Sequence, residues 1–239
     1  GRTGTLTPVA NLAPVTVGGV CVTRATLHNE DEIQRKDIRE GDFVIVQRAG
    51  DVIPQVVEAI AAERGTYTRP FRFPKVCPEC GRPAVRKEGE AARRCVGGLV
   101  CPAQAVERLK HFVSRDAFDI DGLGGAYIEL FWEQGLIASP ADIFRLLEKR
   151  DKLAEREGWG MKSITNLFEA LRQKSVVEFP RFIFALGIRY VGQVNAKLIA
   201  KQYGNLEKWM DEMMRAKDSL SDSYKALIDI DGIGKGVAE

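Results

Sequence analysis

Four of the chain's five cysteines fall in one short stretch, and this cluster limits the possible folds more than any other feature. Their spacing is C-x2-C-x14-C-x5-C, at Cys77, Cys80, Cys95 and Cys101. Two close pairs joined by a short loop can place four sulfurs around one ion, each at about 2.3 Å. Zn²⁺ suits four deprotonated thiols in a closed tetrahedron, which leaves no position open for a substrate. The spacing therefore predicts a structural zinc site.

Disulfides and a redox pair are the competing interpretations of these cysteines. Disulfides require an oxidising compartment, and the opening residues GRTG do not resemble a secretory leader. A thioredoxin-like Cys-x-x-Cys follows a strand in a βαβ unit, and no such pattern surrounds Cys77. The fifth cysteine, Cys21, lies in the β-like run VCVTRATL, where we expect a small buried hydrophobic residue.

The composition is that of a globular protein, but the charge is unevenly distributed. Hydrophobic residues make up 45% of the 239 residues and charged residues 28%, with a net charge of +2. No apolar run approaches the ~18 residues that spanning a membrane requires. Nine Lys and Arg against three Glu give residues 64–94 a charge of +6. This basic segment predicts either a phosphate-binding surface or a solvated loop, and charge alone leaves both open.

The first seventy residues have the pattern of a small β-rich domain. Val and Thr dominate residues 5–26, with Pro and Gly between the apolar runs, as in short strands joined by turns. Asn29, an acidic first turn and Gly41 predict one short helix, followed by two strands around a turn at residues 49–51. An OB-type barrel fits this order, although an SH3-like barrel has much the same pattern.

After Gln104 the pattern becomes helical, and a glycine turn recurs four times. Gly-x-Gly stands at residues 122–124, 158–160 and 232–234. The remaining copy, third in chain order, is Val191-Gly192, which lacks the first glycine. The second glycines are separated by 36, 32 and 42 residues, and each leads into an apolar-periodic helix. The middle residues Leu123, Trp159, Val191 and Ile233 are expected to insert into the core. This pattern indicates helix-hairpin-helix repeats.

Such hairpins are suited to binding phosphate. Glycine adopts positive φ and has no Cβ to hold a ligand away, and the following helix begins with unpaired N–H groups. Contacts of this kind read the nucleic-acid backbone and not the bases, so they predict sequence-independent duplex binding. The alternative is that the glycines only cap helices in an ordinary α-helical bundle. Asp119 and Asp121 precede the first turn and are expected to cap a helix.

We therefore predict a multidomain α+β protein. Its expected parts are a small OB-type β-barrel over residues 1–72, a four-cysteine zinc finger over 73–104 and an all-α helix-hairpin-helix domain over 105–239, whose fourth repeat is truncated. Because the chain opens on Gly1 within a patterned segment, we expect a fragment of a longer protein. His28 and His111 stand alone, and we expect them to be surface or packing residues. No residue is predicted to be catalytic or to bind an organic cofactor.

The order of these modules and several local strings resemble the NAD-dependent DNA ligases of bacteria. The strings are GRTGTLTPVANL, VGGVCVTRATLHN, RAGDVIPQV, CPECG with CPAQ, and DIDGLG, and the resemblance covers the whole chain. It implies that the chain is the DNA-clamping C-terminal portion of such a ligase. It also implies DNA contacts at Arg2, Thr3, Arg48, Val52, Ile53, Gly122, Gly124, Gly158, Gly160, Gly192, Gly232 and Gly234.

The chain also lacks parts that the whole family has. The nucleophile motif Lys-x-Asp-Gly does not occur, so NAD⁺ and Mg²⁺ are expected to act only in the full-length parent. The implied partners are sequence-independent nicked duplex DNA and the missing N-terminal adenylation domain, in bacterial replication and repair. The implied location is the cytoplasm, associated with the nucleoid. The alternative function is a stand-alone DNA-binding module of a repair nuclease or recombination factor.

Overall fold

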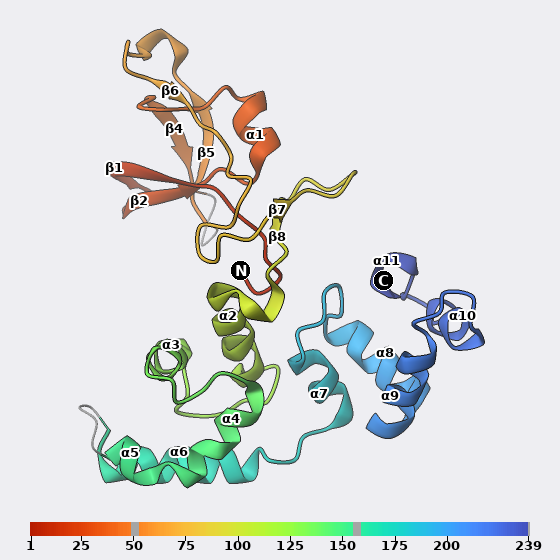
Figure 1. Cartoon of the computed structure of the whole chain (residues 1–239). Coiled ribbons are helices and arrows are strands. Elements are labelled where there is room, and N and C mark those ends of the chain that lie inside the picture. The colour runs from red at the N-terminus through yellow and green to blue at the C-terminus, as the bar shows by residue number, and fades with distance from the viewer. Residues whose placement is uncertain (49–52, 155–158, 239) are drawn as a thin grey trace. The chain divides into compact units, whose positions relative to one another are not determined.

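The computed structural model describes residues 1–48, 53–154 and 159–238 (Figure 1). The chain divides into two compact units. The first holds Gly1 and residues 3–104, and the second holds Arg2 and residues 105–239. The domain limits drawn above, at residues 72 and 104, remain predictions.

The first unit contains a curved four-stranded sheet and a separate, small two-stranded sheet. The sheet has the order β1-β2-β5-β4, and β3 pairs with β6 apart from it. The strands are β1 (Val9–Val17), β2 (Val20–Thr26), β3 (Arg39–Glu40), β4 (Val44–Gln47), β5 (Gln55–Ala59) and β6 (Arg69–Pro70), with a 3₁₀ turn, η1 (Ala61–Glu63), between the last two. Figure 1 shows the strands curling with α1 (Glu30–Arg35) beside them.

The paired strands and helix α1 enclose a small hydrophobic core in the first unit. β1 and β2 are antiparallel from Val9 opposite Thr26 to Val17 opposite Val20, with an irregularity between residues 11 and 15. Ala25, Ile38 and Val56 form the buried centre. The predicted helix is present: the Asn29 side chain accepts a hydrogen bond from the Glu32 amide, and the helix ends at Arg35, before Gly41.

The prediction for Cys21 was wrong, since its side chain is exposed. Alternation along β2 puts Cys21 on the same face as the core residue Ala25, but Cys21 lies beyond the small core of this unit. It pairs with the exposed Thr16, close to the turn at Gly18 and Gly19, where the strand residues are mostly exposed. Among the described residues, Cys21 takes no part in the metal-ligand cluster.

The zinc-finger segment and the helices complete the chain. The finger has β7 (Ala84–Val85), β8 (Arg94–Cys95) and a 3₁₀ turn, η2 (Gly98–Val100). The helices are α2 (Pro102–Val113), α3 (Gly125–Glu133), α4 (Pro140–Arg145), α5 (Arg150–Ala154), α6 (Met161–Gln173), α7 (Phe179–Ala185), α8 (Gln193–Tyr203), α9 (Leu206–Arg215), α10 (Asp222–Ile228) and α11 (Lys235–Ala238), with η3 (Leu146–Glu148) after α4.

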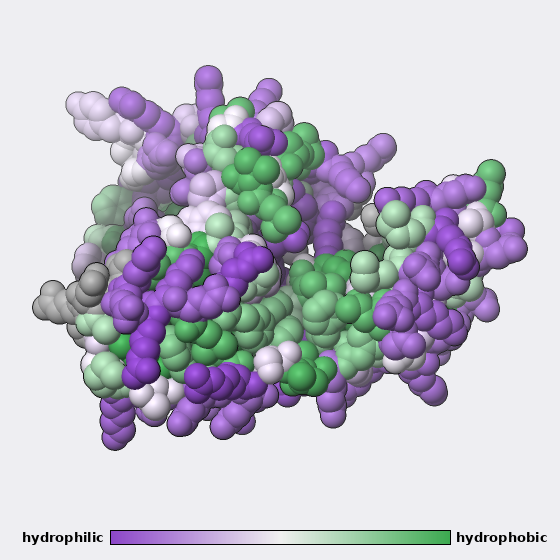
Figure 2. All heavy atoms as spheres, turned by 60° about the horizontal axis from the view of Figure 1, so that its bottom comes forward, coloured by the Kyte–Doolittle hydropathy of each residue, from purple (hydrophilic) through white to green (hydrophobic). Residues whose placement is uncertain are grey.

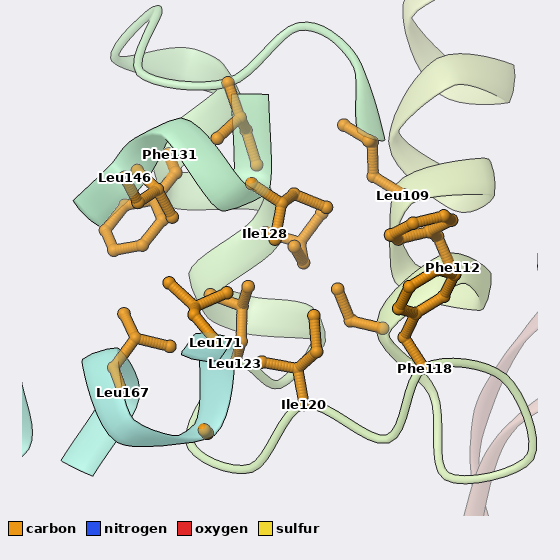
Figure 3. Packing of buried hydrophobic residues seen from close by; sticks show 14 of the residues in the cluster. Leu109, Phe112, Phe118, Ile120, Leu123, Ile128, Phe131, Leu146, Leu167 and Leu171 are labelled. Carbon is orange, nitrogen blue, oxygen red and sulfur yellow. The ribbon is translucent and has the colours of Figure 1, made fainter. Parts of the chain in front are cut away.

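The helical unit contains two hydrophobic clusters. The larger one, seen in Figure 3, gathers residues of α2, α3, η3 and α6 around Ile128 and Phe131. The smaller one gathers α7, α8, α9 and α10 around Ile183 and Trp209. Phe182 and Phe184 of α7 pack against both clusters, so this helix joins the two halves of the unit.

The surface mixes charged and apolar side chains. On the face seen in Figure 2, hydrophilic residues in purple project outward and hydrophobic residues in green show between them. Within the described ranges, no helix is both long and apolar enough to cross a membrane.

Candidate functional site

The four clustered cysteines bring their sulfur atoms together as predicted. All four Sγ atoms lie within 4.8 Å of one another. The two directly paired separations are 4.0 Å for Cys77 and Cys101 and 3.4 Å for Cys80 and Cys95. Sulfurs bound at about 2.3 Å to one tetrahedral zinc stand about 3.8 Å apart. The observed spacing is therefore that of a four-thiolate zinc site.

Backbone hydrogen bonds fix the loops that carry these thiols. The amide of Cys77 donates to the Arg82 carbonyl at 2.8 Å, and the Gly81 amide donates back to the Cys77 carbonyl at 2.9 Å. The Cys95 amide donates to the carbonyl of Gly4 at 2.8 Å. The first pair thus sits in a closed turn, and the second pair is anchored to the start of the chain.

Gly97 lies so close to the sulfurs that a side chain there would force neighbouring atoms to move. A Cβ on this residue would lie 3.0 Å from Cβ of Cys101 and 3.1 Å from the Sγ atoms of Cys80 and Cys95. Its amide donates to Sγ of Cys95 at 3.2 Å. The loop between Cys95 and Cys101 therefore wraps the sulfur cluster and directs a backbone donor at one thiolate.

The electrostatics of the cluster favour deprotonated sulfur at Cys77. Burial raises the pKa of this thiol, but hydrogen bonds from the backbone amides of Cys80 and Glu79 and with the side chains of Cys95 and Cys80 together outweigh it and lower the pKa to about 7. A thiolate is the form that binds metal. Sulfur spacing, closed turns and this thiolate together fit structural Zn²⁺, which these four residues hold without an open coordination position.

The basic segment 64–94 is divided between internal and exposed residues. Arg64 is bound to Asp42 at 2.9 Å, where the carboxylate is almost fully buried. Ion pairs also hold Arg86, Arg93 and Arg94, to Asp31, Glu30 and Glu90 respectively. Within the described chain, the other five basic residues are exposed and make no ion pair: Arg69, Arg72, Lys75, Arg82 and Lys87. These five residues, exposed and outside these ion pairs, are the ones placed to meet an external anion.

Arg2 and Thr3 are tied to other residues of the protein. The Arg2 guanidinium donates to Nδ1 of His111, and Nε2 of His111 donates to the Phe184 carbonyl at 2.8 Å. Burial lowers the pKa of His111, which keeps the ring neutral and able to accept from Arg2. Thr3 Oγ1 accepts from Arg94 at 3.1 Å. His111 is a packing residue, as predicted, with its ring against Phe184.

The other barrel residues implied by the resemblance are only partly described. Ile53 is exposed over 72% of its surface, and Arg48 is half-buried and engaged with other residues. Val52 lies outside the described residues, as does Gly158 of the second helical repeat. Contacts of these four with DNA stay predictions.

The middle residue of every glycine turn is buried, as the repeat pattern predicts. Leu123, Trp159, Val191 and Ile233 are each at most 5% exposed. In Figure 3, Leu123 reaches into the larger cluster with Ile120 and Leu171. Each turn is therefore fixed from inside the protein, while the glycine that follows the buried residue is exposed: Gly124, Gly160, Gly192 and Gly234.

Three of these turns share one backbone geometry. The amide of the middle residue donates to the carbonyl three residues earlier, at 3.3 Å for Leu123, 3.1 Å for Val191 and 2.8 Å for Ile233. The residue before it has positive φ: 80° at Gly122, 64° at Tyr190 and 88° at Gly232. This is the third position of a turn that normally requires glycine. We refer to the turns at residues 120–124, 159–160, 188–192 and 230–234 as the first to fourth hairpins.

Tyr190 was not recognised from the sequence as a member of this set. It occupies the position that Gly122 and Gly232 hold in the first and fourth hairpins. A non-glycine residue in this conformation costs about 1–2 kcal/mol, so the turn geometry is imposed by its surroundings. The signal that could have revealed it is its place directly before Val191-Gly192.

Glycine is the N-cap of the helix that follows each of the first three hairpins. Gly124, Gly160 and Gly192 have extended backbones and precede α3, α6 and α8. A Cβ on any of them, or on Gly234 before α11, would meet no atom within 4 Å. Nothing inside the protein therefore excludes a larger residue from these positions.

Other helices of the chain begin with a side-chain cap. Asn29, Asn205 and Ser221 each accept a hydrogen bond from an amide in the first turn of α1, α9 and α10. Such a cap occupies the third amide of its helix. In α3 the corresponding amide, that of Tyr127, donates to the Gly124 carbonyl at 3.0 Å. Among the described residues, the first two amides of α3 and the first three of α6 and α8 are therefore open to an external acceptor. The prediction that Asp119 and Asp121 cap α3 was wrong, since Gly124 is the cap and Asp119 binds Nζ of Lys174 at 2.9 Å.

A shallow hollow lies beside the first hairpin. It has a volume of about 570 Å³, and its lining includes Lys110, Ser114, Arg115, Asp119, Asp121 and the turn Gly122–Gly125. Lys110 is held by Glu107 at 2.7 Å and Glu129 at 2.6 Å. The hollow combines cationic side chains with the open amides of α3, a set that suits a phosphate group.

Three family models match successive parts of the chain. Residues 1–68 match the NAD-dependent DNA ligase OB-fold domain, residues 76–103 the NAD-dependent DNA ligase C4 zinc finger domain, and residues 181–239 the helix-hairpin-helix motif. The fold and the cysteine site thus define a multidomain protein assembled from an OB-fold, a C4 zinc finger and helix-hairpin-helix repeats, and the OB-fold is favoured over an SH3-like barrel. In these domains the chain belongs to the NAD-dependent DNA ligase family, as the resemblance of its module order and local strings implied.

Several curated bacterial relatives, each named DNA ligase, align with the entire chain. The protein of Rhodospirillum rubrum is 59% identical, that of Afipia carboxidovorans 56% and that of Pelobacter propionicus 52%. The chain spans 35%, 35% and 36% of their lengths. These matches favour the ligase over a stand-alone nuclease or recombination module.

Proposed function

We propose that this chain is the DNA-gripping part of an NAD-dependent DNA ligase. It would hold nicked duplex DNA by the sugar-phosphate backbone while an adenylation domain elsewhere in the protein seals the nick in replication and repair. The observation that carries the proposal is the set of glycine N-caps with open space above them. The ligase domain matches over residues 1–68 and 76–103 support it.

The proposed contact is between hairpin amides and phosphate oxygens. In the described parts of the chain, the first two amides of α3, α6 and α8 have no acceptor in the protein, and the helix dipole adds partial positive charge at the same point. Glycine lets a phosphate approach the backbone closely. The proposed contacts are Gly122, Gly124, Gly158, Gly160, Gly192, Gly232 and Gly234 in the hairpins, and Arg2, Thr3, Arg48, Val52 and Ile53 in the first part of the chain.

The proposed division of labour leaves no chemical step to this chain. NAD⁺ and Mg²⁺ would serve the adenylation domain, whose lysine motif does not occur in these 239 residues. The role of this chain would be to position the nick, which lowers the barrier by holding the reacting groups in place. Zn²⁺ would keep the finger folded and stay away from the reacting atoms. The proposed location is the cytoplasm, on the nucleoid.

Fluorescence anisotropy with labelled duplexes tests the DNA grip. Two nicked duplexes of unrelated sequence should bind with equal affinity, and the affinity should fall steeply as salt rises. A chain that shows no binding at low salt, or that prefers one sequence strongly, would refute the phosphate grip.

A reconstituted sealing reaction tests the ligase assignment separately. A purified adenylation domain from a relative, with NAD⁺, Mg²⁺ and nicked DNA, should seal faster when this chain is added. Sealing that does not change while DNA binding is intact would favour a module that serves another enzyme.

A further inference from the structure

The third hairpin presents side chains that the comparable turns lack. At the second position of the turn, Asp121 and Asp231 in the first and fourth hairpins are replaced by Arg189. At the third position, glycine is replaced by Tyr190. Where the other two turns offer a carboxylate and bare backbone, this turn offers a cation and an aromatic ring.

Arg189 holds the Tyr190 ring in a fixed pose. Its guanidinium carbon lies 4.4 Å from the centre of the ring, and its Nη2 donates a hydrogen bond to the tyrosine hydroxyl. The Tyr190 carbonyl accepts from Nδ2 of Asn195 at 2.9 Å, which fixes the backbone of the turn. The tyrosine is nevertheless 53% exposed. An exposed side chain held in this way loses little freedom when it binds a partner.

The hydrogen bond with Arg189 determines whether the Tyr190 hydroxyl can donate a further hydrogen bond. A guanidinium group has only donors, so the tyrosine oxygen is the acceptor in that bond. The hydroxyl proton is therefore available to a second acceptor outside the protein. Two residues later, Gly192 opens the eleven-residue helix α8, whose first amides attract an anion to the same turn. An ionised phosphate oxygen is the acceptor that suits a hydroxyl donor beside a cation.

We propose that Tyr190 donates a hydrogen bond to a phosphate oxygen of the strand gripped by the third hairpin, with Arg189 positioning the ring. The inference rests on the proposed DNA grip and names one side chain within it. The backbone supports it, because φ at Tyr190 is 64° and glycine would adopt this angle without strain. The fold alone therefore favours glycine here, and a ligand contact explains the tyrosine.

Anisotropy titrations of two variants with a labelled nicked duplex test the contact. Tyr190→Phe removes only the hydroxyl and should weaken binding about three- to tenfold. Because a neutral donor is lost, the dependence of affinity on salt should stay the same. Tyr190→Gly should weaken binding at least as much, while its thermal unfolding midpoint stays the same or rises. Tyr203→Phe is the matched control, since this tyrosine of α8 is buried and should leave binding unchanged.

The possible outcomes distinguish a failure of the Tyr190 contact from a failure of the proposed DNA grip. If the unmodified chain binds DNA and both Tyr190 variants bind equally well, the tyrosine contact is wrong and the hairpin grip stands. If Tyr190→Gly fails to fold, Tyr190→Phe alone decides. If the unmodified chain does not bind, the DNA grip is wrong and the tyrosine contact falls with it.

Discussion

At the residue scale, the zinc site depends on one glycine as well as on four cysteines. A Cβ at Gly97 would press on the sulfurs of Cys80 and Cys95, so glycine lets the loop close over the metal without displacing them. The sequence showed a loose Gly-Gly loop, whereas the structure shows that Gly97 is tightly packed against the sulfur cluster.

Gly97→Ala should destabilise the finger. Forcing a methyl group into contacts of 3.0–3.1 Å is expected to cost about 1–3 kcal/mol and to weaken zinc binding. Thermal unfolding and competition with a chromophoric zinc chelator measure the two effects. Gly65→Ala is the control, because its Cβ would meet no atom within 4 Å. Equal behaviour of the two variants would show that the loop has room to yield.

His111 should make stability depend on pH. Burial lowers its pKa below the ordinary value of 6.5, so the unfolded chain binds the proton more readily than the folded chain. The stabilisation is therefore full above about pH 6.5 and is lost as the pH falls through the folded value. The gap in unfolding free energy between the unmodified chain and His111→Phe should shrink on acidification. A gap that is constant from about pH 7 to about pH 5 would contradict this, and His28→Phe controls for the loss of a histidine.

The spacing of the cysteines in the sequence was sufficient to predict the zinc site, because all four ligands lie in one short segment. The sequence pattern was insufficient for Cys21, because Val20 and Cys21 are both apolar and both exposed, and the sequence does not show how far along β2 the small core extends. The ion pair of Asp119 was equally invisible, since its partner Lys174 is 55 residues away in the sequence. Contacts across the fold carry no local signal.

At the element scale, the helices that follow the hairpins lack a stabilising side-chain N-cap. Asn, Asp and Ser are better N-caps than glycine, and α1, α9 and α10 use Asn or Ser. The helices that follow the hairpins use glycine although a side chain would fit. This contrast is what an anion-binding helix start requires, because a side-chain cap would compete with the anion for the same amides.

Gly124→Asp should therefore separate stability from DNA binding. The new side chain can cap α3 and sit in open space, so the unfolding free energy should stay equal or rise by about a few tenths of a kcal/mol. Its charge should repel phosphate and lower DNA affinity roughly tenfold. Chemical denaturation and anisotropy measure the two quantities on one preparation.

Asn205→Ala provides the opposite case. Removing the cap of α9 should cost about 1 kcal/mol and leave DNA affinity unchanged, since α9 does not follow a hairpin. If Gly124→Asp binds DNA like the unmodified chain, the open amides of α3 are not a phosphate site.

The repeats were predictable as elements because glycine marks a turn and apolar spacing marks the helix after it. Burial of Leu123, Trp159, Val191 and Ile233 confirms that interpretation. The third turn was predicted incompletely, because Tyr190 has the same backbone angle as a glycine without being one. Propensity alone gives no reason to expect a tyrosine there.

At the scale of the whole molecule, the chain consists of two compact units with different sources of stability. The first unit has a small core of Ala25, Ile38 and Val56 and gains from its metal site. The second unit has two larger clusters that share Phe182 and Phe184 of α7. The kinds of module were predictable because each has a local pattern, but the joining of two clusters by one helix depends on long-range packing.

Zinc removal should therefore affect the units unequally. The three tryptophans, Trp132, Trp159 and Trp209, all lie in the second unit, so tryptophan fluorescence reports on that unit alone. Chelation should expose the finger thiols to a thiol reagent and leave the tryptophan unfolding midpoint unchanged. A matching shift of the tryptophan transition would show that the two units unfold together.

The central claim is that hairpin amides grasp the phosphates of a duplex, and amide NMR during a DNA titration tests it most directly. The claim predicts that the amide resonances of Gly124, Gly160 and Gly192 and of the first residues of α3, α6 and α8 shift together. The amide resonances at the capped start of α9 should not shift. Saturated DNA binding with these amide resonances unmoved would contradict the claim.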